Sequence, residues 1–299
     1  MQKAKKVFIT GSTGYVGRNV ARAFRRAGYH VLGLTRDAGK AAGLAAEEIA
    51  PVVGDLQEPA AWRGAAEPAD VLVHAAVDYD TDTMALDQAS VKELIGIARA
   101  RGATLIYTSG VWVHGDTAGT VADENSPLAP IPMVAARVET ERLVLAAPGV
   151  RGIVIRPGIV YGRQGGLTAS FFDEQPVAGD GSNHWPMVHV DDLAEAYVRA
   201  AERGNAGSVY IVTDRSRATV RELVSSARAA AGLGDRVRWI PLAEARRSMG
   251  PLAEAWVLDQ QLSAARAERE LEWRPRHPGF AAEARTYAAA NRKAGQWVR

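Results

Sequence analysis

Short runs of apolar residues alternate with longer stretches of helical periodicity along the first half of the chain. The apolar runs predict successive strands at 7–9, 30–34, 51–53, 71–73, 104–107 and 152–155. Apolar residues at helical spacing predict helices over 16–27 and 91–98, which end at Gly28 and Gly102. Such alternation is typical of a parallel sheet whose strands are buried on both faces. We therefore expect an α/β fold with a doubly wound parallel sheet.

A glycine-rich turn links the first predicted strand to the first predicted helix. It reads Gly11-Ser12-Thr13-Gly14-Tyr15-Val16-Gly17. The first glycine permits a tight turn, the second lets backbone N–H groups approach a pyrophosphate, and the third lets helix and strand pack closely. Thr13, Tyr15 and Val16 lie in the same turn and are expected to contact the same ligand. A strand before and a helix after the turn make chance glycines a poor explanation, so a bound dinucleotide is predicted.

The end of the second strand bears on which dinucleotide binds. An NAD site usually has Asp or Glu there to accept a hydrogen bond from the ribose 2′-hydroxyl, whereas this strand ends Leu34-Thr35-Arg36. A guanidinium suits a 2′-phosphate. NADP(H) is therefore predicted, and NAD(H) is the alternative if Arg36 is only a solvated surface residue.

The pattern changes after Gly162. Glycine-containing loops surround one further strand and helix, a last sheet strand is predicted at 209–212, and the rest is mainly helical. We interpret 1–162 as a Rossmann-type dinucleotide-binding domain, completed by sheet elements within 187–214. Residues 163–186 and 215–299 are interpreted as a small, mainly helical substrate-binding lobe. Open parallel sheets bind ligands at their carboxyl edge, and the lobe is expected to cover that edge.

Composition limits the partners and the chemistry. Lys+Arg 36 against Asp+Glu 34 leave a formal net charge of +2, which gives no electrostatic case for a nucleic-acid or membrane partner. The absence of cysteine excludes disulfides, thiolate metal sites and a cysteine nucleophile. The apolar run after the basic start is too short for a signal peptide, and no apolar stretch is long enough to span a bilayer. We expect a cytoplasmic protein that acts on a small molecule.

Further motifs follow the predicted strands in order along the chain. They are Gly54-Asp55-Leu56, His74-Ala75-Ala76, Tyr107-Thr108-Ser109-Gly110, Arg156-Pro157-Gly158-Ile159-Val160-Tyr161-Gly162, Val188-His189-Val190-Asp191-Asp192-Leu193-Ala194 and Leu271-Glu272-Trp273-Arg274-Pro275. With the Gly-x-x-Gly-x-x-Gly spacing of the turn, this series resembles the extended short-chain dehydrogenases/reductases, the NAD-dependent epimerase/dehydratase group. The likeness covers nearly the whole chain.

The resemblance implies roles for several of these motifs in binding the cofactor. Asp55, followed by Leu56, would contact adenine. The small residues Ala75 and Ala76, which follow His74, would let the cofactor lie against the sheet. The nicotinamide carboxamide would meet the backbone of Pro157, Gly158, Ile159 and Val160. The resemblance also suggests a homodimer.

The proton-transfer residues of that family are not matched. The resemblance implies a tyrosine as proton donor, a lysine four residues later, and a serine or threonine that polarises the substrate oxygen. In the register set by Glu141, Met133 stands at the tyrosine position and Arg137 at the lysine position. Arg137 can keep the ribose contact and the positive charge, but a thioether cannot donate a proton. The usual serine falls on Gly110, and its neighbour Ser109 is the candidate that stands in for it.

Other groups are candidates for proton transfer. Besides Ser109, these are Tyr79, in the loop after Ala76, and His114, at a position that is commonly tyrosine in the family. A solvated loop residue is the alternative for Tyr79, and a partly buried polar residue in a turn is the alternative for His114. Water or the substrate itself is also a possible proton source.

Substrate contacts are expected from residues in loops that face the cleft. They are Trp112, Tyr79, Met133, Phe171, Phe172, His184 and Trp185. Core packing is the alternative for the aromatic residues, and for Met133 an apolar packing role is favoured over a direct chemical one. Sugar-nucleotide enzymes of the family often hold a diphosphate with arginine; Arg163, Arg215 and Arg246 are candidates, but no cluster of basic residues singles one out.

A metal site is not predicted. His184, His189, Asp191 and Asp192 have suitable side chains, but a metal requires converging ligands. The run Asp192-Leu193-Ala194-Glu195 is interpreted instead as a capping box that starts the helix through Val198.

Two functions are compatible with these features. The first is an NADP-dependent oxidoreductase that moves hydride between the nicotinamide and a carbonyl, imine or activated alkene of a small organic substrate, without the usual Tyr/Lys pair. The second is a dinucleotide-binding regulator or scaffold that has lost the chemistry. Loss of the tyrosine at Met133 favours the regulator. Ser109, a full substrate lobe and an aromatic cleft favour the enzyme, which is the preferred hypothesis.

Overall fold

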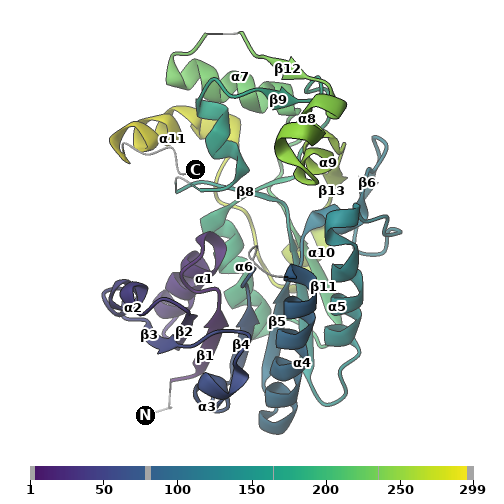
Figure 1. The fold of residues 1–299 in the computed structure, drawn as a ribbon. Coiled ribbons are helices and arrows are strands. Elements are labelled where there is room, and N and C mark those ends of the chain that lie inside the picture. Colours follow the sequence, from purple (N-terminus) through teal and green to yellow (C-terminus); the bar gives the residue numbers. More distant parts are fainter. Residues whose placement is uncertain (1–3, 78–81, 164, 235, 295–299) are drawn as a thin grey trace.

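The computed structural model describes residues 4–77, 82–163, 165–234 and 236–294 (Figure 1). Within these residues, one parallel sheet of seven strands forms the centre of the fold. Its order is β11 (Ser208–Val212), β7 (Arg151–Pro157), β5 (Thr104–Thr108), β4 (Val71–His74), β1 (Lys6–Thr10), β2 (His30–Thr35) and β3 (Ala50–Val53). The predicted doubly wound α/β fold is confirmed, and each predicted strand lies in this sheet.

The two faces of the sheet are buried against different helices because side chains alternate along each strand. Val7 and Ile9 of β1 belong to one hydrophobic cluster, whereas Phe8 between them belongs to a second cluster on the other face. The first cluster includes residues of α1 (Tyr15–Arg26), α2 (Ala38–Ala45) and α6 (Val190–Arg203). The second includes residues of α3 (Arg63–Ala66), α4 (Thr83–Arg101) and α5 (Ala135–Leu145).

A third hydrophobic cluster lies at the end of the molecule toward which the carboxyl ends of the sheet strands point (Figure 1). It is built largely from α7 (Val220–Ala231), α8 (Leu242–Met249), α9 (Leu252–Val257) and α11 (Phe280–Ala294). The short helix α10 (Ala265–Glu270) departs from this arrangement, because Ala267 packs in the first cluster beside the sheet. The domain boundaries proposed from the sequence stay a prediction.

Short strand pairs and 3-10 turns connect the sheet to these helices. The pairs are β8 (Ile159–Tyr161) with β10 (Met187–His189), β9 (Val177–Ala178) with β12 (Trp239–Ile240), and β6 (Val121–Ala122) with β13 (Gln261–Leu262). The 3-10 turns are η1 (Pro59–Ala61), η2 (Val111–His114), η3 (Pro132–Val134) and η4 (Leu167–Phe172). No helix in the described ranges is both long and apolar enough to cross a membrane.

The start of α6 differs from the sequence prediction. The helix begins at Val190, and its N-cap is His189, whose Nδ1 accepts from the backbone N–H of Asp191 at 3.1 Å. The predicted capping box at Asp192 is therefore wrong. The Asp192 carboxylate instead accepts hydrogen bonds from the backbone N–H groups of Arg276 and His277, each at 3.1 Å. The Asp192 carboxylate therefore binds the segment before α11 to α6 and does not cap the helix.

Candidate functional site

The glycine-rich turn between β1 and α1 is shaped for a close approach of backbone to ligand. Gly11 has a φ of +71°, and a Cβ there would lie 2.6 Å from the carbonyl oxygen of Ala75. A Cβ at Gly17 would overlap the carbonyl oxygen of Gly11. Gly14 is the N-cap of α1 and offers no side-chain acceptor to the first N–H groups of the helix. These groups and the helix dipole suit an anion such as a pyrophosphate.

A cavity of about 190 Å³ opens beside this turn, and we call it the turn cavity. It brings together most of the residues predicted at the adenine end of the cofactor: Gly11, Thr13, Gly14, Arg36, Asp55, Leu56, Ala75 and Ala76. The turn cavity is also lined by Lys40, which the sequence analysis did not single out. The feature of the sequence that could have indicated Lys40 is its position four residues after Arg36, in the first turn of α2. Two basic side chains therefore line the end of the cavity next to β2.

A second and larger space, the main cleft, has a volume of about 400 Å³ and shares Ala75, Ala76 and Val77 with the turn cavity. The predicted site residues that line it are Tyr15, Val16, Ala75, Ala76, Ser109, Trp112, Met133, Arg137, Pro157, Gly158, Ile159 and Val160. The residues proposed for the nicotinamide thus meet Ser109 and Arg137, proposed for catalysis, and Trp112 and Met133, proposed for the substrate. The two adjoining spaces lie at the carboxyl edge of the sheet, where open parallel sheets bind dinucleotides.

Ser109 and Arg137 carry the hydrogen-bonding capacity of the main cleft. Arg137 lies in the first turn of α5, and its Nη1 donates to the carbonyl oxygens of Thr108 and Ser109 at 3.1 and 3.0 Å. The side chain of Ser109 is buried, and within the described chain its Oγ has no hydrogen-bond partner. A buried hydroxyl without a protein partner is costly unless a ligand or water satisfies it. Since both residues line the main cleft, they are candidates for contact with a bound molecule.

Met133 lies in η3, one turn before Arg137, and also lines the main cleft. Both residues thus reach the cleft from one segment. The thioether presents an apolar surface where the family resemblance implies a tyrosine hydroxyl. The assignment of the two residues to the Tyr and Lys positions rests on the sequence register.

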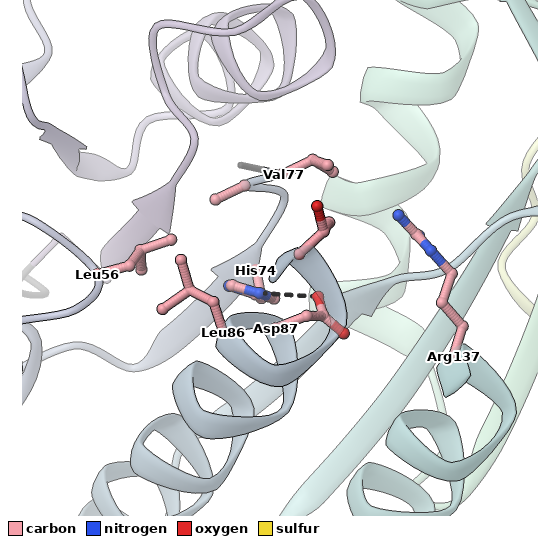
Figure 2. A pocket seen from close by; sticks show the side chains of 8 residues that line it. Leu56, His74, Val77, Leu86, Asp87 and Arg137 are labelled. Atoms are coloured by element: carbon pink, nitrogen blue, oxygen red, sulfur yellow. Dashed lines mark hydrogen bonds and ion pairs between the residues drawn. The ribbon is translucent and has the colours of Figure 1, made fainter. Parts of the chain in front are cut away.

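A small pocket of about 10 Å³, lined by apolar and polar side chains, lies next to the main cleft, with room for about one water (Figure 2). Asp87 of α4 is its buried acid: Oδ1 lies 3.2 Å from His74 Nε2, and Oδ2 accepts from the Tyr107 hydroxyl at 2.7 Å. His74 Nδ1 is 2.8 Å from the Thr10 hydroxyl. Arg137 also lines this pocket, on the side away from Leu56 (Figure 2).

Two opposing effects set the charge state of Asp87. Burial acts to raise the pKa of this carboxyl, but the hydrogen bonds from His74 and Tyr107 and the nearby charge of Arg137 outweigh it. The pKa of Asp87 is therefore held below its ordinary value, and the carboxylate stays charged. Sequence reasoning missed Asp87, because only the packing of α4 against β4 and β5 brings it beside His74. This network holds His74 in the wall of the small pocket, and His74 is not among the described residues that line the turn cavity or the main cleft.

Several predicted site residues lie away from the main cleft. His114 is buried, with Nε2 3.1 Å from Arg156 Nη1, and Arg156 forms two hydrogen bonds with Glu141. Burial and the charge of Arg156 lower the pKa of His114 to about 4, so the ring is neutral at neutral pH. Tyr79 lies outside the described residues.

The predicted lobe contacts are likewise placed elsewhere. Phe171 and Trp185 stack with ring centroids 5.6 Å apart inside the third hydrophobic cluster, where Phe172 is also buried. These three aromatic side chains form part of the hydrophobic core of the lobe. Core packing was the alternative given for them in the sequence analysis. His184 is paired with Asp259 at 2.8 Å. None of these side chains is among the described residues that line the main cleft.

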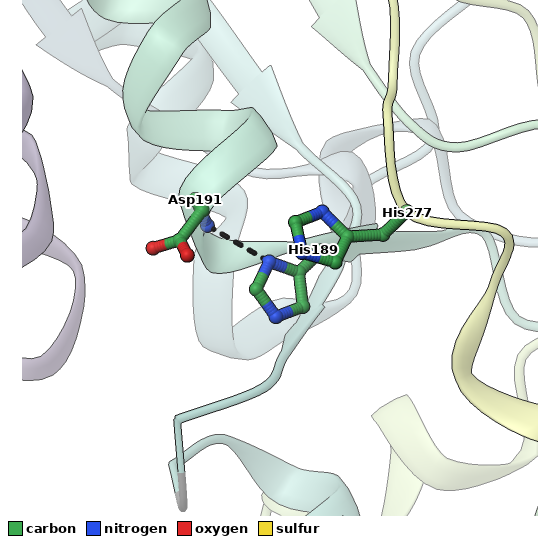
Figure 3. Close-up of side chains that lie close together, drawn as sticks. All are labelled: His189, Asp191 and His277. Carbon is green, nitrogen blue, oxygen red and sulfur yellow. Dashed lines mark hydrogen bonds between the residues drawn. The ribbon is translucent and has the colours of Figure 1, made fainter. Parts of the chain in front are cut away.

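His189, Asp191 and His277 form a cluster of potential metal ligands (Figure 3). The two imidazole rings are stacked, with centroids 3.5 Å apart and an angle of 16° between their planes. Nitrogen lone pairs lie in the ring plane, so near-parallel stacked rings do not aim at one ion in the tetrahedral manner of a zinc site. Asp191 is also engaged by Arg163 at 2.7 Å. The geometry supports a packing contact between α6 and the segment before α11.

The turn, the two adjoining spaces and the hydroxyl and guanidinium of the main cleft define an enzyme of the NAD(P)-dependent oxidoreductase type. The chain belongs to the NAD-dependent epimerase/dehydratase family, whose model matches residues 7–213. This result confirms the family resemblance drawn from the sequence motifs.

Curated relatives match most of the chain. A 3-diazoavenalumate denitrifying reductase from a Streptomyces species is 30% identical, over 92% of this chain and 97% of the relative. A 4-hydroxy-2-methyl-3-oxo-4-farnesyl-3,4-dihydroquinoline-1-oxide ketoreductase from Stigmatella aurantiaca is 28% identical, over 81% and 78%. A 2-alkyl-3-oxoalkanoate reductase from Stenotrophomonas maltophilia is 26% identical, over 76% of each chain.

Solved structures share the fold at lower sequence identity. A dTDP-glucose 4,6-dehydratase from Bacillus anthracis in complex with NAD superposes with a TM-score of 0.83 at 19% identity, covering 98% of each chain. A UDP-glucose 4-epimerase from Thermotoga maritima with UDP-glucose gives a TM-score of 0.82 at 19% identity, covering 97% of this chain and 100% of that one. These neighbours establish the architecture.

Proposed function

We propose that the protein is an NADP-dependent reductase of a small organic carbonyl compound. The observation that carries this proposal is the meeting of Ser109, Arg137 and the Pro157–Val160 backbone in the main cleft. When bound, the dinucleotide supplies a hydride to the carbonyl carbon and becomes NADP⁺, while the carbonyl oxygen takes up a proton to give the alcohol. The names of the relatives, two of which are reductases of oxo compounds, support a reduction.

The proposed preference for NADP rests on Arg36 and Lys40. Both line the turn cavity at the end of β2, where a 2′-phosphate would lie. Asp37 lies between them in sequence, but its carboxylate accepts from the backbone N–H of Gly39 at 2.7 Å and caps α2. This cap uses Oδ1, and Asp37 also lines the turn cavity. The proposed preference therefore rests on two cations beside one acid, an arrangement that favours a phosphate over a ribose hydroxyl.

The cleft residues have distinct proposed roles. The unpartnered Ser109 hydroxyl donates a hydrogen bond to the substrate oxygen, and water that enters the cleft restores its proton. Arg137, held by two carbonyl oxygens, contacts the ribose, and its charge stabilises the negative charge that develops on the substrate oxygen. Met133 forms part of the apolar wall. General acid catalysis by a tyrosine is absent from this scheme.

The second candidate function is a regulator or scaffold that binds the dinucleotide without turning it over. Met133 is the observation that favours it, because the residue lines the cleft where a proton-donating tyrosine is implied. The two functions differ in one measurable property, the consumption of NADPH.

The test is the loss of NADPH absorbance over a panel of aldehydes, ketones, quinones and imines, with the wild type and Met133→Tyr side by side. We expect the wild type to oxidise NADPH with at least one carbonyl compound. The new phenol lies one turn from Arg137, and general acid catalysis typically contributes at least about 100-fold, so an increase in kcat of about ten-fold or more is expected. Tight NADPH binding with a wild type inactive on the whole panel would support the regulator instead.

A further inference from the structure

The main cleft is poor in charge. Arg137 is the only Lys, Arg, Asp or Glu among the described residues that line it. Much of the wall is apolar, formed by Val77, Met84, Trp112, Met133, Ile159 and Leu167. A ligand is matched to such a wall when it presents apolar surface and few polar atoms.

Most of the hydroxyl groups of the cleft are already used within the protein. The Thr108 hydroxyl accepts from the Tyr197 hydroxyl at 2.7 Å, and the Tyr15 hydroxyl donates to the carbonyl oxygen of Gly162 at 2.7 Å. Ser109 is different, because its buried Oγ has no partner in the described chain. Among the described residues that line the cleft, Ser109 and Arg137 are thus the candidates for polar contact with a bound molecule, and the proposed function gives the guanidinium to the cofactor ribose.

A nucleoside diphosphate sugar does not fit this distribution of polar groups. A diphosphate needs cations or several N–H donors, because a buried charge without partners is strongly disfavoured. The three arginines considered for this role form ion pairs outside the wall of the cleft: Arg163 with Asp191, Arg215 with Glu268 and Arg246 with Glu254. By sequence, residues 78–81 and 164, which border the cleft segments, include neither lysine nor arginine.

We propose that the substrate is an apolar ketone without phosphate, in which the carbonyl oxygen accepts from Ser109 Oγ and the hydrocarbon body lies against Trp112 and Met133. This inference rests on the proposed function for the placement of the cofactor. It separates the protein from the sugar-nucleotide enzymes whose fold it shares, since here the substrate is held by apolar contact and a single hydroxyl.

Binding measurements test the substrate class apart from turnover. The NADP⁺-loaded protein is titrated in a calorimeter with 4-phenyl-2-butanone and, separately, with UDP-glucose. We expect saturable binding of the ketone and none of UDP-glucose. Ser109→Ala should weaken ketone binding by about ten-fold, and the matched variant Ser225→Ala, on the exposed face of α7, should leave it unchanged.

The outcomes for the substrate class and for the proposed function are distinct. UDP-glucose binding to the loaded protein, or ketone binding that is absent or unaffected by Ser109→Ala, overturns the proposed substrate class. Ketone binding with the expected Ser109 dependence upholds that class even if no NADPH is consumed, in which case it is the reductase function that fails. Because Ser109 is buried, thermal unfolding of Ser109→Ala is compared with that of the wild type. Met133→Ala, at a half-buried position, is a second variant; it is expected to weaken ketone binding and to leave NADP⁺ binding unchanged.

Discussion

At the scale of single residues, the proposed preference for NADP rests on two basic side chains that flank an acid in the sequence. Arg36 directly follows the last residue of β2, and Lys40 lies in the first turn of α2. Both line the turn cavity. The carboxylate of Asp37 caps the same helix. A phosphate placed between these cations would gain charge-assisted hydrogen bonds that a ribose hydroxyl does not require.

Arg36→Ala is expected to weaken NADPH binding by about 10–100-fold and to change NADH binding by less than about two-fold, because only the 2′-phosphate loses a partner. Lys40→Ala should act in the same direction by a smaller factor. Titration of each variant with both dinucleotides provides the measurement, and Arg217→Ala, an exposed arginine outside the cavity, is the control. An Arg36→Ala protein that keeps its preference for NADPH would show that the phosphate lies elsewhere.

Residues at the ends of strands were predictable, whereas residues brought in by helices and loops were not. Gly11, Ala75 and Ser109 each follow a strand, and parallel strands carry their ends to one edge. Asp87 and Lys40 belong to helices, and their place in the site depends on how those helices rotate and pack. Phe171 was expected in the cleft because it is an aromatic residue in a predicted loop, but it packs in the aromatic core of the lobe.

At the scale of elements, α6 is held by two histidines that sequence periodicity does not reveal. His189 caps the helix and stacks on His277, which precedes α11. Burial, followed by the charge of His277, lowers the pKa of His189 to about 4. His114, behind α5, is lowered to about 4 by burial and Arg156. Both rings are therefore neutral in the folded protein at pH values where an unfolded chain already protonates them.

This difference predicts that the free energy of unfolding begins to fall near pH 6.5, above the pH at which carboxyl groups titrate. A histidine whose folded pKa lies below its unfolded value of about 6.5 stabilises the fold fully above that value. Its contribution is lost as pH falls toward about 4, because protons bind the unfolded chain more readily. The expected loss is roughly 1–3 kcal/mol for each ring.

Urea unfolding at several pH values between 7.5 and 4.5 measures this loss. His189→Asn keeps an N-cap acceptor but removes the titrating group, so the free energy of unfolding should fall less steeply with decreasing pH than in the wild type. If the free energy of unfolding fell equally steeply with decreasing pH in wild type and His189→Asn, His189 would not contribute to the acid sensitivity.

At the scale of the whole molecule, the main cleft is assembled where three parts of the chain meet. Residues after β4 and β5 supply its floor, the β7–β8 connection supplies the expected nicotinamide surface, and Leu167 of η4 belongs to both the cleft wall and the third hydrophobic cluster. The indole N–H of Trp273 donates to the carbonyl oxygen of Asp192 at 2.8 Å and ties the late chain to α6. The parallel sheet was predictable from periodicity; the meeting of sheet edge and lobe depends on long-range packing.

In the proposed reaction, hydride passes directly from bound NADPH to a carbonyl carbon, and Ser109 rather than a tyrosine contacts the substrate oxygen. The most direct measurement uses NADPH carrying deuterium at nicotinamide C4, in the R or the S position, with 4-phenyl-2-butanone and mass spectrometry of the alcohol. We predict deuterium in the alcohol from only one of the two labelled forms, because the Pro157–Val160 backbone fixes one nicotinamide face. Loss of a hydrogen bond to the developing oxyanion predicts a rate about 100-fold lower in Ser109→Ala. Alcohol without deuterium from either form, or an unchanged rate in Ser109→Ala, would contradict the account.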